Sequence, residues 1–274
     1  MTEDYHLTPQ SLVGRRFGPD VFGGIRVALM GFCPPPEVFG RYKRERVRDQ
    51  HFIHLSPDSV RIVQHGGQRV LSLAHVYGGP VGSATVEELA YYGIEIVLAY
   101  GLAGGLGVGD ATGESLGMGD CYLVQDALAR DGTTPHYTDL PVVSADDGLA
   151  EQVGAAWSGQ GKLHAVRAAT NDAIYRESNA MLDRFRAAGC HVVNLDSAHL
   201  YAASLVNSAG RRLRTVQCGV VSDVVWPDGG SESALAEMLA EGGKGVNPLA
   251  KTGEILRFYL ESLVPRMSRT PQIS

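Results

Sequence analysis

Two acidic residues follow apolar runs at places where their side chains could contact a ligand. Asp223 comes with Ser222 directly after the apolar run 215–221, and Asp196 follows a second such run. In α/β sheets, ligands bind beyond the ends of the strands. Asn194 stands two residues before Asp196, so in an extended segment both side chains lie on one side. A carboxylate and an amide placed in this way suit the vicinal hydroxyls of a sugar.

Each of these residues also has a purely structural explanation. Asp223 could cap the turn after its strand, and Asp196 or Ser197 could cap the helix expected over 197–208. The sequence leaves this choice open. His199 could join Asp196 on a metal ion, but no third ligand is apparent, so we predict a hydrogen-bonded helix histidine and no metal site.

Two glycine-rich segments flank a predicted helix. Segment 78–82 follows an apolar run, the helix is expected over 83–92 with the pair Glu87 and Glu88, and segment 101–105 follows the next apolar run. Glycine has no Cβ, so the backbone of such turns can approach a small ligand closely. The sequence therefore predicts two glycine-rich turns that line a pocket.

Two further segments carry candidate residues. Tyr175, in TNDAIYRE (170–177), could stack on a base, although an aromatic residue there is more often part of the core. His136, in RDGTTPHY (130–137), could reach the site of a neighbouring subunit. Both residues are therefore candidates for the walls of a pocket.

The sequence does not support two common motifs, the GxSxG nucleophile elbow of α/β-hydrolases and the GxGxxG motif of dinucleotide-binding proteins. The pentapeptide 113–117 matches GxSxG, but a strand-like run follows it instead of preceding it, so we predict a loop. No GxGxxG spacing fits residues 101–109, and no helix follows them. We predict no cofactor.

Short apolar runs alternate with segments of helical periodicity along the chain. The expected strands cover 26–30, 68–77, 95–100, 121–124, 164–168, 191–195 and 215–221. The expected helices cover 83–92, 147–157, 178–188, 197–208 and 248–264. This alternation predicts a single three-layer α/β/α domain with a central mixed sheet over 1–274, in which 1–22 form an N-terminal extension.

The composition limits the partners and the compartment. The formal net charge of −6 argues against a nucleic-acid partner, and the basic run 41–48 is more typical of a solvated helix face. The four cysteines lie far apart with no CxxC pair, which is typical of a reducing compartment. No leader-like segment or run of about 18 apolar residues is present. We expect a cytoplasmic protein that binds neither nucleic acid nor membrane.

Taken in order, these segments resemble the nucleoside phosphorylase family, which includes purine and uridine phosphorylases and the methylthioadenosine/S-adenosylhomocysteine nucleosidases. The resemblance is carried by GGPVGSATVEEL (78–89), YGLAGGL (100–106), RDGTTPHY (130–137), TNDAIYRE (170–177), VVNLDSAHLYAAS (192–204) and VVSD (220–223). It implies a single-domain α/β fold with a central mixed sheet. It also implies a homodimer or a homohexamer, because the family assembles as dimers or trimers of dimers.

The resemblance implies roles for the matching residues. Asp223 matches the acid with which purine-cleaving members protonate the leaving base. Leu195 and Asp196 match the family's hydroxyl-binding Met-Glu, and Asn194 stands where an acidic residue is usual. The other residues implied to line a nucleoside site are Ser222, Ile174 and Tyr175 at the base, His136 of a neighbouring subunit at the sugar, and Gly78, Leu102, Ala103 and Gly104 in the glycine-rich segments.

The positions at which phosphorylases hold phosphate are not cationic here. The family's arginines correspond to Pro36 or Glu37, to Ala99 and to the region of Gln50, and a Ser or Thr corresponds to Leu102. A dianion without Arg or Lys partners would be poorly compensated. The nucleosidases share these empty positions and activate water with a Glu, for which Glu37 is the match.

We therefore expect an enzyme that hydrolyses the N-glycosidic bond of a purine-type nucleoside or modified nucleoside. Glu37 would activate the water, and Asp223 would act as the general acid. Two alternatives stay open. One is phosphorolysis with phosphate ligands from elsewhere in the chain, and the other is a nucleoside-binding protein that cleaves nothing.

Overall fold

A computed structural model describes residues 5–207, 210–211, 213–240 and 246–267. Within these ranges, eleven strands form one sheet of parallel and antiparallel pairs. The strands are β1 (Val27–Gly31), β2 (Lys43–Arg46), β3 (Val60–His65), β4 (Gln68–Leu73), β5 (Ile96–Gly105), β6 (Cys121–Arg130), β7 (Val142–Ser144), β8 (Leu163–Asn171), β9 (Val192–Asn194), β10 (Arg214–Val225) and β11 (Ser231–Ser233). The helices are α1 (Gly79–Tyr91), α2 (Asp147–Ala156), α3 (Asn179–Ala187), α4 (Ser197–Leu205), α5 (Ala234–Leu239), α6 (Pro248–Arg257) and α7 (Val264–Met267).

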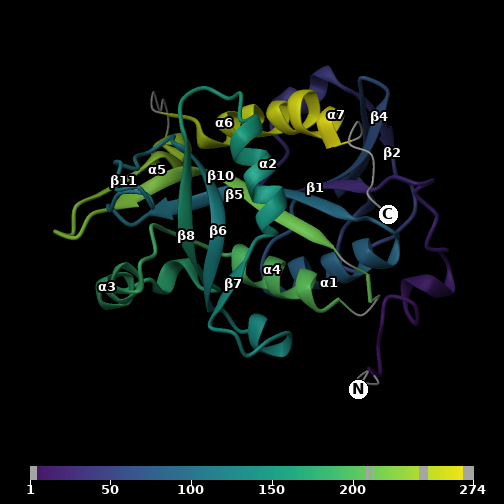
Figure 1. The fold of residues 1–274 in the computed structure, drawn as a ribbon, viewed down its shortest axis with the longest axis horizontal. Coiled ribbons are helices and arrows are strands. Elements are labelled where there is room, and N and C mark those ends of the chain that lie inside the picture. The colour runs from purple at the N-terminus through teal and green to yellow at the C-terminus, as the bar shows by residue number, and fades with distance from the viewer. Residues whose placement is uncertain (1–4, 208–209, 212, 241–245, 268–274) are drawn as a thin grey trace.

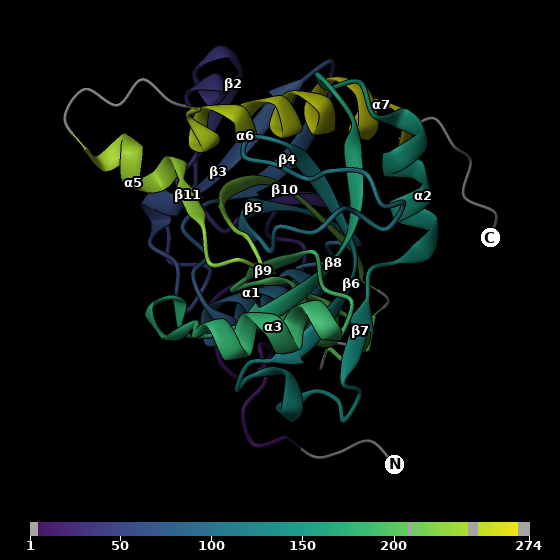
Figure 2. The ribbon, with the colours of Figure 1, turned by 90° about the vertical axis from the view of Figure 1, so that its left-hand side faces the viewer.

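Helices cover the sheet on two sides (Figure 1). On one side, α6 packs on β5 and β10 and continues through a π-helical turn, Phe258–Leu263, into α7. On the other side, α4 packs on β6, β8 and β10, next to α1. In the view turned by 90°, α6 again lies above the strands and α3 below them (Figure 2). The predicted α/β class with a central mixed sheet is confirmed.

Two buried tyrosines fix these helical layers to the sheet. Tyr201 of α4 donates a hydrogen bond to the carbonyl of Val124 on β6 at 2.8 Å. From the opposite layer, Tyr259 donates to the carbonyl of Ala99 on β5 at 2.9 Å. Each hydroxyl thus finds a partner when its ring is buried, which lets a large apolar side chain also set the register of a helix on a strand.

Part of the sheet closes on itself. β10 runs parallel to β5 along one edge, while the opposite edge of β5 pairs first with β1 and then, at Gly104 and Gly105, with β9. From β10 the ring continues through β6 and β8 back to β9. Gly104 and Gly105 of β5 therefore lie between β9, the strand that leads to Asp196, and β10, the strand that contains Asp223.

The second glycine-rich segment is a strand and not a turn. β5 continues past residue 100 to Gly105 because β10 and β9 pair with its two edges, which outweighs the low strand propensity of glycine. The first glycine-rich segment also contradicts the prediction, since α1 begins at Gly79 and not at residue 83. Pro80 suits a first helical turn, and only Gly78, with φ of 80°, turns the chain.

Two further predictions differ from the structure. β10 runs to Val225, past the predicted strand end at residue 221, so Asp223 lies inside the strand and not beyond it. The basic run 41–48 is not a helix face, since Lys43–Arg46 form β2, which pairs antiparallel with β3 at the end of the sheet. Charged side chains suit such an edge because they oppose pairing with another chain. The other predicted strands and helices are present, α4 ends at Leu205, and residue 208 lies outside the described residues.

Two remaining observations concern the loop predicted over 113–117 and the length of the helices. Segment 113–117 has neither helix nor strand, as predicted. In the part of the chain that the structure describes, no helix combines the length and the apolar character that crossing a membrane requires.

Candidate functional site

Asp223 lies at a β-bulge in β10. Val221 pairs with Ala103 on β5 and Asp223 pairs with Gly104, so Ser222 is an extra residue in the ladder. A bulge re-aims the side chains around it. Here the Ser222 hydroxyl donates to Oδ1 of Asp223 at 2.7 Å. No backbone N–H of the described residues donates to this carboxylate, so Asp223 does not cap the following turn.

Asp196 stands at the N-cap position of α4 without capping it. Asn194 caps the helix instead, because its Oδ1 accepts from the backbone N–H groups of Asp196 and Ser197 at 3.2 and 3.3 Å. The Asn194 amide is therefore engaged within the protein, and its expected contact with a sugar stays a prediction. The Asp196 carboxylate stays available for another partner, although the residue is only 5 % exposed.

Two glycines of β5 leave room for these carboxylates. An ideal Cβ on Gly104 would lie 2.7 Å from Oδ2 of Asp223, and one on Gly101 would lie 3.4 Å from Oδ2 of Asp196. Both side chains therefore lie against the bare backbone of one strand. The Asp196 and Asp223 side chains thus occupy the space beside these glycines that the sequence analysis assigned to a ligand.

In the part of the chain that the structure describes, no positively charged residue shifts the pKa of Asp196. Burial raises the pKa of Asp196 well above its usual range, and the nearby Gln217 amide lowers it in part. No Arg or Lys of the described residues acts on this pKa. Burial and then the charge of Asp196 raise the pKa of Cys33 to about 12, and the pKa of Tyr77 is raised by burial, Cys33 and Asp196. The slot beside Asp196 is thus lined by neutral groups.

Three of the positions that correspond to phosphate ligands are apolar or engaged elsewhere. Ala99 is fully buried in β5. Gln50 donates from Nε2 to the carbonyls of Phe52 and Leu55 at 2.7 and 2.8 Å, within its own loop. Leu102 is half-buried. None of these positions supplies a positive charge to the site.

Glu177 is a further acidic residue near Asp223 that the sequence analysis did not single out. Its Oε1 accepts a hydrogen bond from Nδ2 of Asn171, the last residue of β8, at 3.3 Å. Burial and the charge of Asp223 raise the pKa of Glu177, and the Asn171 amide lowers it. The sequence feature that could have identified Glu177 is its place at the end of the segment TNDAIYRE, just beyond a strand.

The short 3₁₀ turn η5 (Ile174–Arg176) connects Asn171 to Glu177. On it, Tyr175 is 95 % exposed and Ile174 is 53 % exposed. The alternative that Tyr175 belongs to the core is therefore wrong. Stacking of Tyr175 or Ile174 on a base stays a prediction.

Glu37 is the first residue of η2 (Glu37–Arg41), a 3₁₀ turn that packs on α6. Its side chain is exposed and makes no hydrogen bond or ion pair with the residues that the structure describes. Nothing in these contacts joins it to Asp196 or Asp223, so its role as the base that activates water stays a prediction.

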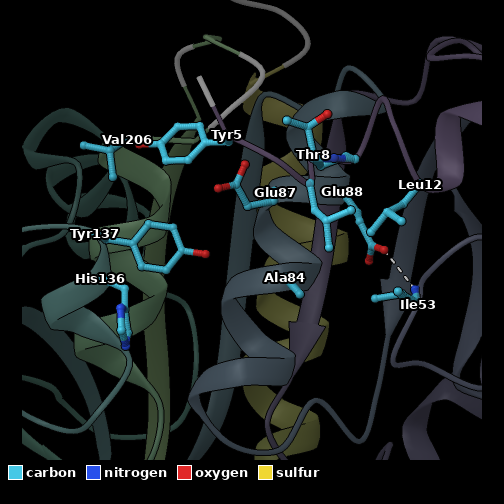
Figure 3. Close-up of a pocket in the computed structure, with 12 residues that line it drawn as sticks. Tyr5, Thr8, Leu12, Ile53, Ala84, Glu87, Glu88, His136, Tyr137 and Val206 are labelled. Carbon is cyan, nitrogen blue, oxygen red and sulfur yellow. Dashed lines mark hydrogen bonds between the residues drawn. The ribbon is translucent and has the colours of Figure 1, made fainter. Parts of the chain in front are cut away.

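His136 ends η4 (Thr134–His136) and is exposed at a groove of about 320 Å³ (Figure 3). The groove runs between the N-terminal segment, α1 and η4, and Glu87 and Glu88 of α1 also line it. None of the other predicted site residues lines this groove. Contact of His136 with a neighbouring subunit's site stays a prediction.

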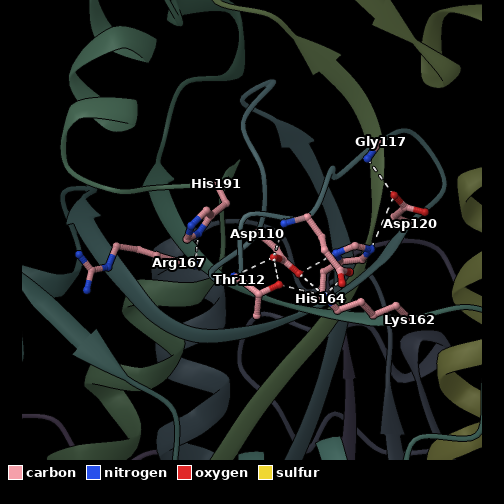
Figure 4. A network of polar contacts seen from close by, with 9 residues as sticks. Asp110, Thr112, Gly117, Asp120, Lys162, His164, Arg167 and His191 are labelled. Atoms are coloured by element: carbon pink, nitrogen blue, oxygen red, sulfur yellow. Dashed lines mark hydrogen bonds and ion pairs between the residues drawn. The ribbon is translucent and has the colours of Figure 1, made fainter.

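A separate polar cluster lies at the start of β8 (Figure 4). Asp110, Glu114 and His164 are the three potential metal ligands that lie close together among the described residues. However, the Lys162 ammonium donates to Asp110 at 2.8 Å and also to Glu114. The ammonium group already supplies the positive charge, so we assign this cluster as an ion-pair network.

His199 of α4 is fully buried and does not belong to that cluster. Neither of its ring nitrogens has a hydrogen-bond partner in the described part of the chain, so the expectation of a hydrogen-bonded helix histidine was wrong. Burial lowers its pKa to about 4. A neutral ring therefore packs between Phe32 and the backbone of Gly82.

Comparison with known proteins identifies the family. The sequence profile of the phosphorylase superfamily matches residues 26–250, a range that includes both carboxylates. The chain is 32 % identical over 226 residues, 82 % of its length and 84 % of the relative's, to uncharacterized protein R802 of Acanthamoeba polyphaga mimivirus. It is 29 % identical over 127 residues, 46 % of its length and 50 % of the relative's, to guanosine phosphorylase of Halorubrum lacusprofundi. The chain therefore belongs to the phosphorylase superfamily, the family that its motifs resemble.

Proposed function

We propose that this protein cleaves the N-glycosidic bond of a purine-type nucleoside, with water as the acceptor. The observation that carries the proposal is the pair of carboxylates, Asp196 and Asp223, placed against glycines of β5, with no Arg or Lys of the described residues acting on Asp196. When this bond breaks, positive charge grows on the sugar and electrons flow into the base. A fixed anion at the sugar and a proton donor at the base both stabilise that transition state.

The two carboxylates take different roles. Asp196 binds the sugar hydroxyls and, in its ionised form, stabilises the cation electrostatically, since no Arg or Lys of the described residues competes for it. Asp223 protonates, or hydrogen-bonds to, the base as it leaves, while Ser222 holds its other oxygen. Proton transfer by a positioned side chain typically contributes about 10²–10⁴-fold to the rate.

The neutral slot supports water as the acceptor. Phosphate brings two negative charges and needs charge-assisted contacts, which Ala99, Leu102 and Gln50 do not offer. Water needs only a base, and Glu37, exposed at the start of η2, is our candidate for this role.

Phosphorolysis is a second candidate function. The similarity to guanosine phosphorylase favours it, and the same similarity supports a purine-type substrate. Phosphate would then be held by basic residues from elsewhere in the chain or from a neighbouring subunit.

The deciding experiment incubates the native protein with a nucleoside panel, with and without phosphate, and separates the products by chromatography. The panel contains guanosine, inosine, adenosine, methylthioadenosine and, as a pyrimidine control, uridine. Hydrolysis predicts free base under both conditions and no free base from an Asp223→Ala variant. A sugar 1-phosphate that forms only with phosphate would replace hydrolysis by phosphorolysis.

We further propose that the protein is a homodimer or a homohexamer in which His136 of each copy closes the sugar end of a neighbour's site. The exposure of His136 on η4 supports this arrangement. Light scattering coupled to gel filtration measures the assembly. His136→Ala is expected to raise KM more than it lowers kcat, because the residue binds the sugar and not the leaving base.

A further inference from the structure

Gln217 is a fully buried amide in β10, the strand that also carries Asp223. Its backbone N–H donates to Oη of Tyr201 at 3.2 Å, and its Oε1 lies 2.8 Å from Oγ of Ser197. Ser197 and Tyr201 stand one turn apart in α4. Gln217 therefore ties the first turn of α4, next to Asp196, to β10.

The direction of the Gln217 amide follows from a chain of hydrogen bonds that begins at the backbone. Oδ1 of Asn194 accepts from backbone N–H groups, so Nδ2 is the end of that amide that meets Oγ of Ser197, at 2.7 Å. An amide nitrogen only donates, so the Ser197 hydroxyl gives its own proton to Oε1 of Gln217. Nε2 of Gln217, with two N–H groups, must therefore point away from Ser197.

Nε2 of Gln217 points to the bare side of Gly101. It lies 3.5 Å from the position of an ideal Cβ on Gly101, and Oδ2 of Asp196 lies 3.4 Å from the same position. The buried Nε2 atom has no hydrogen-bond partner among the described residues. Buried N–H groups are almost always paired in folded proteins, and the Asp196 carboxylate is the acceptor that shares this space.

We propose that Gln217 is a positioning residue that holds the Asp196 carboxylate toward the sugar of the bound nucleoside by donating one N–H to it beside Gly101. The inference rests on the proposed function for the identity of the ligand, but the contact itself concerns residues of this chain alone. A hydrogen bond to the ionised form favours that form. Gln217 thus opposes in part the upward shift that burial imposes on the pKa of Asp196, and it orients the carboxylate where no Arg or Lys of the described residues does so.

The test follows the ionisation of Asp196 directly. Protein with ¹³C-labelled aspartate is titrated by NMR, and Asp196→Asn assigns the signal. Gln217→Leu is expected to raise the pKa of Asp196 by about one pH unit or more, the size expected for a lost hydrogen bond to a charged group. Ser197→Ala removes the hydrogen bond that holds the Gln217 amide and is expected to give a smaller rise in the pKa of Asp196.

Two further variants keep the result interpretable. Thr85→Val, in α1, removes another buried and unpartnered polar atom and is expected to leave the pKa of Asp196 unchanged. Gln217→Glu keeps the shape of the side chain and carries the test if Gln217→Leu does not fold. It is expected to raise the pKa of Asp196, because two carboxyls then face each other. An Asp196 pKa that is the same in the native protein and in either folded Gln217 variant overturns the proposal.

Kinetics separate this inference from the proposed function. If the native protein cleaves nucleosides, the acidic limb of kcat/KM moves to higher pH in Gln217→Leu by as much as the pKa of Asp196 rises, and kcat changes more than KM. In acid, a pKa that is higher by one pH unit makes the rate about tenfold lower. If the native protein cleaves no nucleoside, the proposed function fails, and the NMR titration still decides the role of Gln217.

Discussion

Oδ2 of Asp223 lies 2.7 Å from the position that a Cβ on Gly104 would take, closer than a carbon and an oxygen can approach without displacement. The other carboxylate oxygen is held by the Ser222 hydroxyl, so the side chain cannot simply turn away. A larger residue at this position of β5 would therefore have to displace the Asp223 carboxylate.

Gly104→Ala tests this relationship. The methyl group displaces the Asp223 carboxylate, and because a misplacement of about 1 Å can cost about 100-fold, kcat/KM should fall by that order. The matched control is Gly154→Ala in α2, where a new Cβ meets nothing within 4 Å. This control should keep full activity and gain about 0.5–1 kcal/mol of stability. Equal activity of both variants would contradict the assigned contact.

Asp223→Asn removes the proton donor while keeping the shape of the side chain. We expect kcat to fall by about 10²–10⁴-fold, since the leaving base then departs unprotonated. Steady-state kinetics with the best nucleoside of the panel measure this effect, and circular dichroism checks the fold. Asp228→Asn, in the turn after β10, is the control and should retain the native rate. A native rate for Asp223→Asn would remove this residue from the mechanism.

Glu88 makes stability depend on pH. The residue is only 4 % exposed, and burial raises its pKa from 4.5 to about 7 although the N–H of Ile53 donates to it at 2.9 Å. Since the folded pKa is the higher one, the associated stability is present below pH 4.5 and is lost as the pH rises through 7. The loss is of the order of 3 kcal/mol.

The measurement compares urea unfolding of the native protein and of Glu88→Gln from about pH 4.5 to about pH 8. The free energy of unfolding of the native protein should fall relative to that of Glu88→Gln as the pH rises. Parallel pH profiles of the two proteins would show that Glu88 is not the group responsible.

Asp110 should have the opposite pH dependence. Although burial raises its pKa, hydrogen bonds from Lys162, Thr112 and His164 outweigh that effect and hold the pKa well below its usual range. Its stabilising contribution is thus present above the unfolded pKa of about 3.9 and is lost only in stronger acid. We expect Asp110→Asn to lower the free energy of unfolding at neutral pH by about 2 kcal/mol, because Lys162 is 37 % exposed and partly screened.

Asp183→Asn is the matched control, since the Asp183 carboxylate pairs with Arg186 but is 65 % exposed. It should change the free energy of unfolding by less than about 1 kcal/mol. A chelator should leave the melting temperature of the native protein unchanged, because Lys162 supplies the charge that a metal ion would. A lower melting temperature in chelator would show that the cluster binds metal.

The fold class and the positions of the two candidate carboxylates could be read from the sequence because both depend on local patterns. Alternating apolar runs and helical periodicity report which segments bury one face. These patterns located α4, the strand before it and most of β10, although β10 runs past its predicted end at residue 221. A polar residue that follows an apolar run comes just after the strand at Asp196, whereas at Asp223 it lies at a β-bulge inside the strand. The order of motifs along the chain then identified the family.

The partners of these residues could not be read in the same way, since they come from segments far apart in the chain. The capping role of Asn194 depends on how β9 enters α4, and Glu177 comes near Asp223 only when β8 and β10 join one closed sheet. Residues 101–105 carry weak strand propensity, yet they form the end of β5 because β9 and β10 supply hydrogen bonds to both edges. The sequence by itself determined which residues could act, because burial patterns are local. Only the tertiary structure decided what they contact, because strand pairing joins residues with no regular spacing along the chain.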